Sequence, residues 1–192
     1  MNSLKRTSVG GLLGLAAWAV AGISTAADRP AVPVGALAAP PTVDGIVVEA
    51  EWAGGAVVDV DCVQIRPGVG RGSRFGTVVR VGQAAGALYV AFESFDPEPS
   101  RLAAAVTQRD GDMDDDDAVG VVLDTFLDGR TAYAFATNAL ATQWDARIAD
   151  NGRTTDEVWD EAWACASQRG DDRWTVEFEI PFAILRYEPG ED

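Results

Sequence analysis

Alternation of apolar and polar side chains with a period of two dominates this chain, and this period favours strands over helices. The clearest run is Trp174–Ile180, in which large apolar side chains alternate with Thr175, Glu177 and Glu179 before Pro181 ends the run. A strand of this pattern buries one face and exposes the other. No segment has the length and 3.6-residue period of a substantial helix.

Turn signals separate such runs along the chain. Asp128-Gly129 and Asn151-Gly152 each lie between two alternating runs, as in hairpins. The spacing predicts an all-β fold, an antiparallel β-sandwich of the jelly-roll kind with about nine strands. One short helical turn is expected at Glu49–Trp52, with Trp52 in the core. The expected strands are Ala56–Val63, Thr77–Gly82, Leu88–Phe95, Arg101–Thr107, Val119–Phe126, Thr131–Thr137, Thr142–Ile148, Val158–Ser167 and Trp174–Ile180.

The first 27 residues have the pattern of a secretory signal peptide. Lys5 and Arg6 precede the uncharged stretch Val9–Ile23, and small residues follow at Ser24–Ala27. The uncharged stretch is shorter than the roughly 20 residues that span a bilayer as a helix. We therefore expect a cleaved leader at 1–27, an extended proline-rich segment at 28–41, and an exported sandwich domain at 42–192, either periplasmic or associated with the outer membrane.

Charge and composition exclude several functions. The formal net charge is −15, and removal of the leader with its two basic residues takes it to −17, so binding of nucleic acid has no electrostatic basis. The chain has no His, the commonest general base and a common ligand of zinc and haem. Met113 is the one Met after the leader, which argues against a haem-binding sandwich. No pair of carboxylates is singled out as acid and base, so we expect no enzyme.

Two cysteines, Cys62 and Cys165, are open to two interpretations. An exported protein can pair them, and a disulfide closing a loop of about 100 residues stabilises by up to about 4.7 kcal/mol in the chain-entropy model. Alternatively, both are buried thiols that pack as small apolar groups. The sequence favours neither.

Several motifs, in this order, resemble the family 9 carbohydrate-binding modules. The resemblance is closest to the version at the N-terminus of large exported bacterial proteins whose later part is an outer-membrane β-barrel. It covers nearly all of the expected domain. The motifs are PPTVDG…EAEW at Pro40–Trp52, ALYVAFESFDPEPS at Ala87–Ser100, QRDGDMDDDDAVGVVLDTFLDGRTAYAFATN at Gln108–Asn138, QWDA at Gln143–Ala146 and RWTVEFEIPFAILRY at Arg173–Tyr187.

This resemblance implies a β-sandwich that binds polysaccharides or oligosaccharides through aromatic side chains, holds structural calcium, and supports carbohydrate degradation or uptake without catalysis. It also implies a downstream domain of the parent chain as a partner. In such proteins a further strand follows the IPF…LRY motif, whereas this chain stops at Asp192. We therefore expect one sheet edge to lack its neighbour.

Sugars present apolar C–H faces ringed by hydroxyls, so a binding site needs flat aromatic rings beside planar polar groups. Trp144 and Trp159 have polar neighbours in the sequence and are the candidate aromatic platforms. Arg109, Asn138 and Gln143 are the candidate hydrogen-bonding residues. The alternative role of each Trp is packing in the core, and this alternative is stronger for Trp163 and Trp174. The alternative role of Arg109 is a structural ion pair with Asp110.

The acidic loop Gly111–Asp117 concentrates carboxylates before an expected strand. Calcium takes six to eight oxygen ligands, so Asp112, Asp114 and Asp116 are candidate ligands. The spacing differs from that of an EF-hand, because Asp115 stands where the loop glycine belongs. A solvated acidic loop without metal is the alternative.

The main competing function is structural. A sandwich of this kind would seat a downstream barrel in the periplasm or at the cell surface and bind no sugar. A direct glycan-binding measurement separates the two roles.

Overall fold

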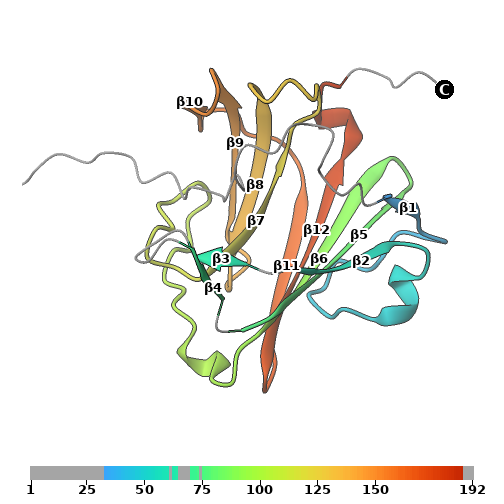
Figure 1. The fold of residues 1–192 in the computed structure, drawn as a ribbon, viewed down its shortest axis with the longest axis vertical. Coiled ribbons are helices and arrows are strands. Elements are labelled where there is room, and N and C mark those ends of the chain that lie inside the picture. The colour runs from blue at the N-terminus through green and yellow to red at the C-terminus, as the bar shows by residue number, and fades with distance from the viewer. Residues whose placement is uncertain (1–32, 61, 65–69, 74, 188–192) are drawn as a thin grey trace, which may run out of the picture.

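The computed structural model describes residues 33–60, 62–64, 70–73 and 75–187. The expected leader and the first residues of the proline-rich segment lie outside these ranges. The described residues form two β-sheets packed face to face, which are the two layers seen in Figure 1. This confirms the predicted all-β sandwich. No described helix is long and apolar enough to cross a membrane.

The larger sheet has six strands and contains the clearest run of the sequence. Its order is β1-β5-β6-β12-β11, and β2 also pairs with β5. All pairs are antiparallel except that of β1 with β5, which is parallel. The strands are β1 (Gly35–Ala36), β2 (Ala56–Val60), β5 (Thr77–Ala84), β6 (Ala87–Phe95), β11 (Ala164–Arg169) and β12 (Arg173–Pro181).

The smaller sheet has four strands in the order β10-β9-β8-β7, all antiparallel. A two-stranded sheet of β3 and β4 lies between β2 and β5 in sequence. Three short 3-10 helices, η2, η3 and η4, complete the described elements. Their bounds are β7 (Ala118–Leu123), β8 (Ala132–Asn138), β9 (Gln143–Ala149), β10 (Thr154–Asp156), β3 (Val63–Gln64), β4 (Arg71–Gly72), η2 (Glu49–Trp52), η3 (Pro99–Arg101) and η4 (Phe182–Ile184).

The core between the sheets is built on the alternation of the sequence. The apolar face of β12 turns inward, and Phe178 is fully buried. Its ring meets Phe92 of β6 edge to face at 5.7 Å between centroids, and Trp163 at 5.3 Å. Trp163 in turn meets Phe135 of β8 at 5.3 Å. These T-shaped contacts link the two sheets through one aromatic cluster.

The outer face of the large sheet is partly covered by the segment that precedes β2. Trp52, at the end of η2, is 3 % exposed and packs with Leu37 and Tyr89, which confirms its expected place in a core. Glu177 of β12 faces this segment and is 1 % exposed. Its Oε2 accepts hydrogen bonds from the backbone N–H groups of Asp44 and Gly45, at 3.1 and 2.9 Å. One buried carboxylate therefore holds the turn at residues 44–45 on the sheet.

Glu177 makes stability depend on pH. Burial raises its pKa above the ordinary 4.5, although two backbone N–H groups favour the charged form. The stabilising contribution of this group is complete below its unfolded pKa and is lost as pH rises through the folded pKa. We expect the unfolding free energy of the protein, minus that of Glu177→Gln, to fall as the pH rises above about 4.5. Urea unfolding at each pH measures this difference, and a constant value would contradict the assignment.

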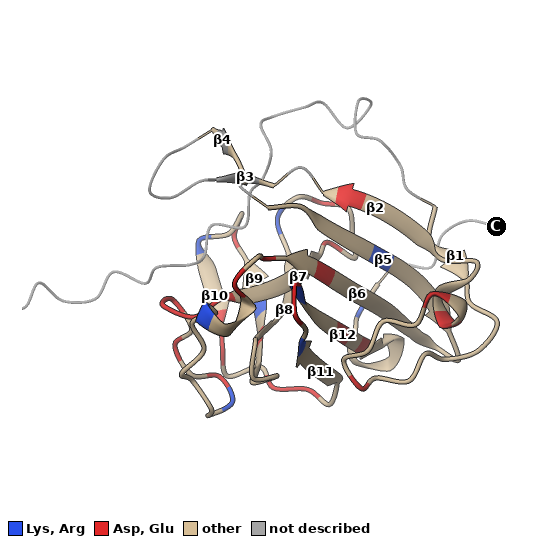
Figure 2. Ribbon diagram, turned by 90° about the horizontal axis from the view of Figure 1, so that it is seen from below, with Lys and Arg blue, Asp and Glu red and all other residues tan. Residues whose placement is uncertain are grey.

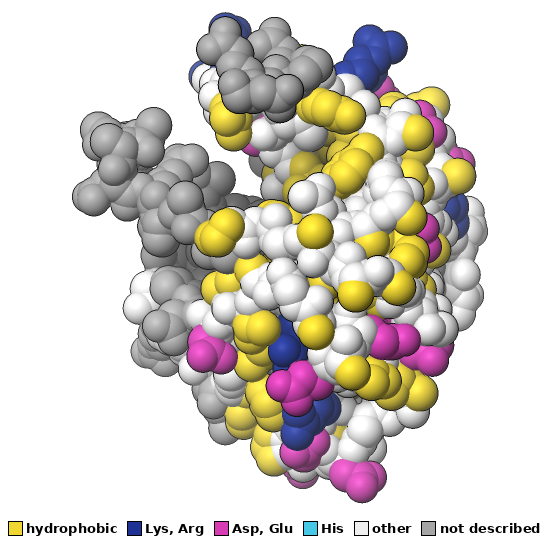
Figure 3. All heavy atoms as spheres, turned by 90° about the vertical axis from the view of Figure 1, so that its right-hand side faces the viewer, with side chains coloured by type: hydrophobic (Ala, Val, Ile, Leu, Met, Phe, Trp, Pro, Cys, Tyr) yellow, Lys and Arg dark blue, Asp and Glu magenta, His cyan; other side chains and the backbone are white. Residues whose placement is uncertain are grey.

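Charged side chains on the same outer face form a ladder across three strands. Arg80 of β5 contacts Glu93 of β6 at 2.8 Å, and Arg173 of β12 contacts the same carboxylate at 3.2 Å. The Arg173 guanidinium also lies 4.4 Å from the centroid of the Phe95 ring. Figure 3 shows basic and acidic side chains next to one another on this side of the molecule. The Glu93 carboxylate therefore pairs with the guanidinium groups of both Arg80 and Arg173.

Two expected strands differ most from the structure. Residues 102–107 form no strand, because the backbone N–H groups of Ala103 and Ala105 are bonded to the carboxylates of Asp117 and Asp116. The expected strand Val158–Ser167 starts only at Ala164 in β11. Before it, the chain leaves the sheet so that Trp159 and Trp163 can turn into the core.

The two cysteines are free thiols, so the disulfide alternative is not formed in this structure. Cys62 is exposed. Cys165 of β11 is half-buried, and its Sγ lies 3.5 Å from the Oγ1 of Thr137 and from the carbonyl oxygen of Ala141. Burial raises the pKa of the Cys165 thiol, so this group is neutral at ordinary pH.

Candidate functional site

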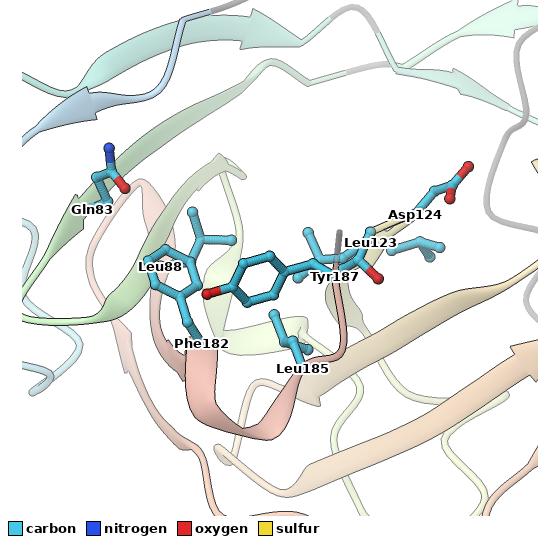
Figure 4. A pocket seen from close by; sticks show the side chains of 9 residues that line it. Gln83, Leu88, Leu123, Asp124, Phe182, Leu185 and Tyr187 are labelled. Carbon is cyan, nitrogen blue, oxygen red and sulfur yellow. The ribbon is translucent and has the colours of Figure 1, made fainter. Parts of the chain in front are cut away.

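An open pocket of about 540 Å³ lies where the end of β7 meets β5, β6 and η4. Its apolar surface comes from Leu88 of β6, Leu123 of β7 and Leu185 after η4. This volume is within the range of small-molecule sites, which combine apolar walls with a few polar groups. Figure 4 shows side chains from both sheets converging on this space.

Two aromatic rings, Phe182 and Tyr187, form one side of the pocket. Their centroids are 6.4 Å apart and their planes are inclined by 66°. Tyr187 is 53 % exposed, and its ring lies across the middle of the pocket in Figure 4. Its hydroxyl has no hydrogen-bond partner among the described residues, so both the ring face and the hydroxyl are available to a ligand.

The segment that carries these rings is attached to both sheets. Pro181 ends β12, and η4 follows directly. The backbone N–H of Arg186 donates to the Tyr133 hydroxyl of β8 at 3.3 Å, and the Arg186 carbonyl oxygen accepts from Thr125 after β7 at 2.5 Å. These contacts place Tyr187 next to the pocket by fixing the residue before it.

Polar groups lie at opposite ends of the pocket in Figure 4. The Gln83 side chain of β5 is exposed, and its amide makes no hydrogen bond to another described residue. Asp124 follows β7, and its carboxylate accepts the backbone N–H groups of Asp128 and Gly129 at 3.2 and 2.8 Å. A free amide and an oriented carboxylate beside an aromatic ring can together bind a polyhydroxylated molecule.

The predicted polar residues Arg109 and Gln143 are brought together, but within the protein's own hydrogen-bond network. Arg109 Nη1 donates to Gln143 Oε1 at 2.6 Å, and Nη2 contacts the carboxylates of Asp145 and Asp160 and the carbonyl oxygen of Glu161. The Gln143 amide donates to the Trp163 carbonyl oxygen at 2.7 Å. These contacts give both residues a structural role, although the buried Nε of Arg109 makes no hydrogen bond to a described residue and lies 3.5 Å from Asp110.

Asp145 of β9 is the centre of this network and was not singled out by its sequence. It is fully buried, pairs with Arg109, and accepts Trp163 Nε1 at 3.1 Å and the Glu161 backbone N–H at 3.0 Å. Burial raises its pKa, against the opposing effects of these donors and of Arg109. The alternating pattern of β9 places Asp145 on the same side as Gln143, facing the core.

The polar groups of Asn138 also form hydrogen bonds within the protein. It is fully buried, and its Nδ2 donates to the Val106 carbonyl oxygen at 2.7 Å and to Asp116 at 2.8 Å. Its Oδ1 accepts the backbone N–H groups of Leu140 and Thr142. All of its hydrogen-bonding groups are occupied. Its predicted ligand-binding role stays a prediction that these contacts do not support.

The predicted calcium ligands are spread along the acidic loop. Asp116 accepts hydrogen bonds from Ala105, Val106 and Asn138, and these donors lower its pKa against the opposing effect of burial. Asp112 accepts the Asp114 backbone N–H at 3.0 Å. Among the described residues no three acidic, His or Cys side chains are grouped to hold a metal. As arranged, these residues do not fit calcium, which stays a prediction.

The two candidate Trp platforms have different surroundings. Trp159 packs against Tyr133 at 5.0 Å and Phe135 at 5.8 Å between centroids, so its ring belongs to the core. Trp144 pairs with Ala136 in the β8–β9 ladder and points away from the core, opposite to Asp145. It is half-buried and makes no hydrogen bond or ring contact with another described residue. Its indole therefore remains available.

Sequence reasoning missed Phe182, Tyr187 and Gln83 as site residues. Gln83 falls at the end of a strand whose alternation shows nothing unusual. Phe182 and Tyr187 are five residues apart, and they come together because η4 follows β12 and the Leu185 N–H closes it by donating to the Phe182 carbonyl oxygen at 3.1 Å. The sequence signal for this turn was Pro181, which ends the strand.

Comparisons with solved structures show which fold this chain shares. No family model matches the chain, and no curated protein matches it. A crystal structure from Bacteroides uniformis, of a protein to which carbohydrate binding is provisionally ascribed, matches with a TM-score of 0.60 at 15% identity, covering 82% of this chain and 75% of that one. This similarity shows the fold alone.

Two solved structures of a family 9 carbohydrate-binding module from Caldicellulosiruptor kristjanssonii also match. The complex with glucose has a TM-score of 0.49 at 20% identity and covers 81% of this chain and 69% of that one. The complex with cellotriose has a TM-score of 0.47 at 19% identity and covers 77% and 66%.

Proposed function

We propose that this protein is a non-catalytic carbohydrate-binding domain, and that the pocket between β7 and β5–β6 is its sugar site. The observation that carries the proposal is the pocket itself, in which the half-exposed ring of Tyr187 lies between apolar side chains and the free amide of Gln83. Sugars need this combination of a ring face and planar polar groups.

The fold and the leader support the same proposal. The sandwich resembles that of the Bacteroides uniformis protein, to which carbohydrate binding is also ascribed. The signal-peptide pattern at residues 1–27 predicts export, and export would bring the domain to polysaccharides outside the cytoplasm. In this proposal the domain holds sugars for degradation or uptake by other proteins or by other parts of its own chain.

Of the predicted site residues, only Trp144 keeps an aromatic surface free for a ligand, and it does not line the pocket. Arg109, Asn138 and Gln143 use their polar groups inside the protein, so they contribute to the scaffold. Trp144 offers a second aromatic surface on the outer face of the small sheet. It is therefore the natural alternative to test against Tyr187.

Tyr187→Ala is expected to weaken sugar binding about tenfold or more, because truncating a central aromatic contact commonly costs at least about 1.4 kcal/mol. Calorimetric titration of gluco-, xylo- and galacto-oligosaccharides measures the affinity. Trp144→Ala is the matched aromatic control and should bind like the unaltered protein. Loss of binding in Trp144→Ala alone moves the site to the small sheet, and no binding of any glycan by the unaltered protein favours the structural role.

A further inference from the structure

Strand β7 is an open edge of the small sheet. Within the described part of the chain it pairs with β8 on one side only. On its other side, its outward backbone N–H and C=O groups have no hydrogen-bond partner among the described residues.

The sequence of β7 has none of the features that usually protect an edge. Residues Ala118–Leu123 read AVGVVL, with no charged side chain and no proline. Natural sheets block their free edges with Lys, Pro, bulges or inward-pointing charges. Val122 on the solvent side of β7 is 42% exposed, and Val121 on the core side is only half-buried. This edge is suited to pairing.

The opposite sheet extends beyond β7. Leu123 of β7 lines the same pocket as Leu88 of β6 and Gln83 of β5, which places the end of β7 across the pocket from these two strands. Beyond β5 lies β2, where Val58 and Val60 point inward by their pairing with β5. Both are half-buried and neither belongs to the core cluster. One further strand beside β7 would cover this inner surface of β5 and β2.

Carboxylates lie before and after β7. Asp114 and Asp115 are exposed and accept no hydrogen bond from a described residue. Asp124 and Asp128 follow the strand. Acidic positions lie mainly in the loops that connect the strands, as Figure 2 shows. A second copy of β7 paired antiparallel would bring Asp115 of one chain towards Asp124 of the other, so charge opposes self-pairing and favours basic ends on a partner.

We propose that β7 binds an extended segment of a partner protein by strand addition, and that this segment alternates apolar and polar residues and has Lys or Arg at both ends. The backbone of β7 provides the hydrogen bonds, and the apolar side chains of the segment pack on the inner surface of β5 and β2. The basic ends pair with the acidic residues before and after β7. Because Leu123 and Asp124 also line the pocket, this segment and a sugar at the pocket are expected to exclude one another.

Hydrogen exchange tests the proposal with a peptide of alternating valine and threonine that carries two lysines at each end. The peptide is expected to slow exchange of the outward-facing amides of β7. The double variant Asp114→Asn, Asp115→Asn should bind it about threefold to tenfold more weakly, the loss expected of two exposed ion pairs. The matched control Glu157→Gln, Asp171→Asn removes two exposed charges elsewhere and should bind it normally.

Four results overturn the proposal. The first is peptide-induced protection at another strand. The second is equal binding of a peptide with glutamates at its ends. The third is protection of β7 that grows with protein concentration and accompanies a dimer in sedimentation, which identifies a second copy as the occupant. The fourth is full protection of β7 in the chain alone, which shows that the chain itself covers this edge.

Discussion

Asp145→Ala is expected to lower the unfolding free energy by about 3 kcal/mol, because it removes the fully buried partner of an ion pair whose other side chain, Arg109, is 31% exposed. The side chain is fully buried and accepts hydrogen bonds from Trp163 and Glu161 in addition to the Arg109 contact. Its removal takes one carboxylate from the Arg109 guanidinium, which keeps Asp160 and the Glu161 carbonyl oxygen, and leaves the Trp163 indole N–H and the Glu161 backbone N–H without their acceptor. Urea unfolding followed by tryptophan fluorescence measures the loss.

Asp160→Ala is the matched control for Asp145→Ala. Asp160 contacts the same Arg109 Nη2, at 2.6 Å, but its side chain is 61% exposed. Exposed pairs contribute about 1 kcal/mol or less, so this variant should be nearly as stable as the unaltered protein. Equal losses in the two variants would show that burial of Asp145 is not what makes its contacts important.

Phe178→Ala is expected to cost about 3–5 kcal/mol through loss of buried surface and the cavity left behind. Phe178 is fully buried and contacts Phe92 in its own sheet and Trp163 between the sheets. Because these contacts hold the two sheets together, the variant should also lower the slope of unfolding free energy against urea if the sheets begin to separate.

Val57→Ala is the control for Phe178→Ala. Val57 lies in β2 on the face turned away from the core, and it is 56% exposed. Thermal unfolding should place this variant close to the unaltered protein and Phe178→Ala far below it. A small loss in Phe178→Ala would mean that the core closes around the vacant space.

The sandwich could be predicted because the sequence patterns that specify its strands and turns involve residues close together in the chain. The alternation in Trp174–Ile180 predicts the inward face of β12, and the turn at Asp128-Gly129 predicts the connection of β7 and β8. Each depends on a few neighbouring residues. The expected strand Arg101–Thr107 failed because its backbone partners are the side chains of Asp116 and Asp117, ten or more residues away.

The candidate site was harder to predict because polar residues do not show in the sequence what they bind. Arg109 and Asn138 have the hydrogen-bonding groups of sugar-binding residues, yet both donate them to carboxylates and carbonyl groups of the protein itself. Trp159 has polar neighbours in the sequence and still packs in the core. The pocket combines Gln83, Leu123 and Tyr187 from three distant segments, which only the tertiary structure brings together.

The partners of the carboxylates in the acidic loop could not be predicted from the sequence either. The density of carboxylates suggested calcium, since like charges this close need a cation or solvent. The structure offers them another partner, because Asp116 and Asp117 bind backbone N–H groups of residues 103–106. Asp116→Ala should therefore loosen this crossing segment whether or not calcium is added, and faster hydrogen exchange at Ala105 and Val106 would report it.

The most direct measurement of the sugar site is a titration followed by NMR signals of the aromatic rings and side-chain amides. We expect an oligosaccharide that binds to shift the signals of Tyr187, Phe182 and the Gln83 amide saturably, with one dissociation constant, and to leave the indole signals of Trp144 and Trp159 unchanged. Shifts confined to Trp144, or signals of Tyr187 that stay constant while calorimetry shows binding, would contradict the proposed site.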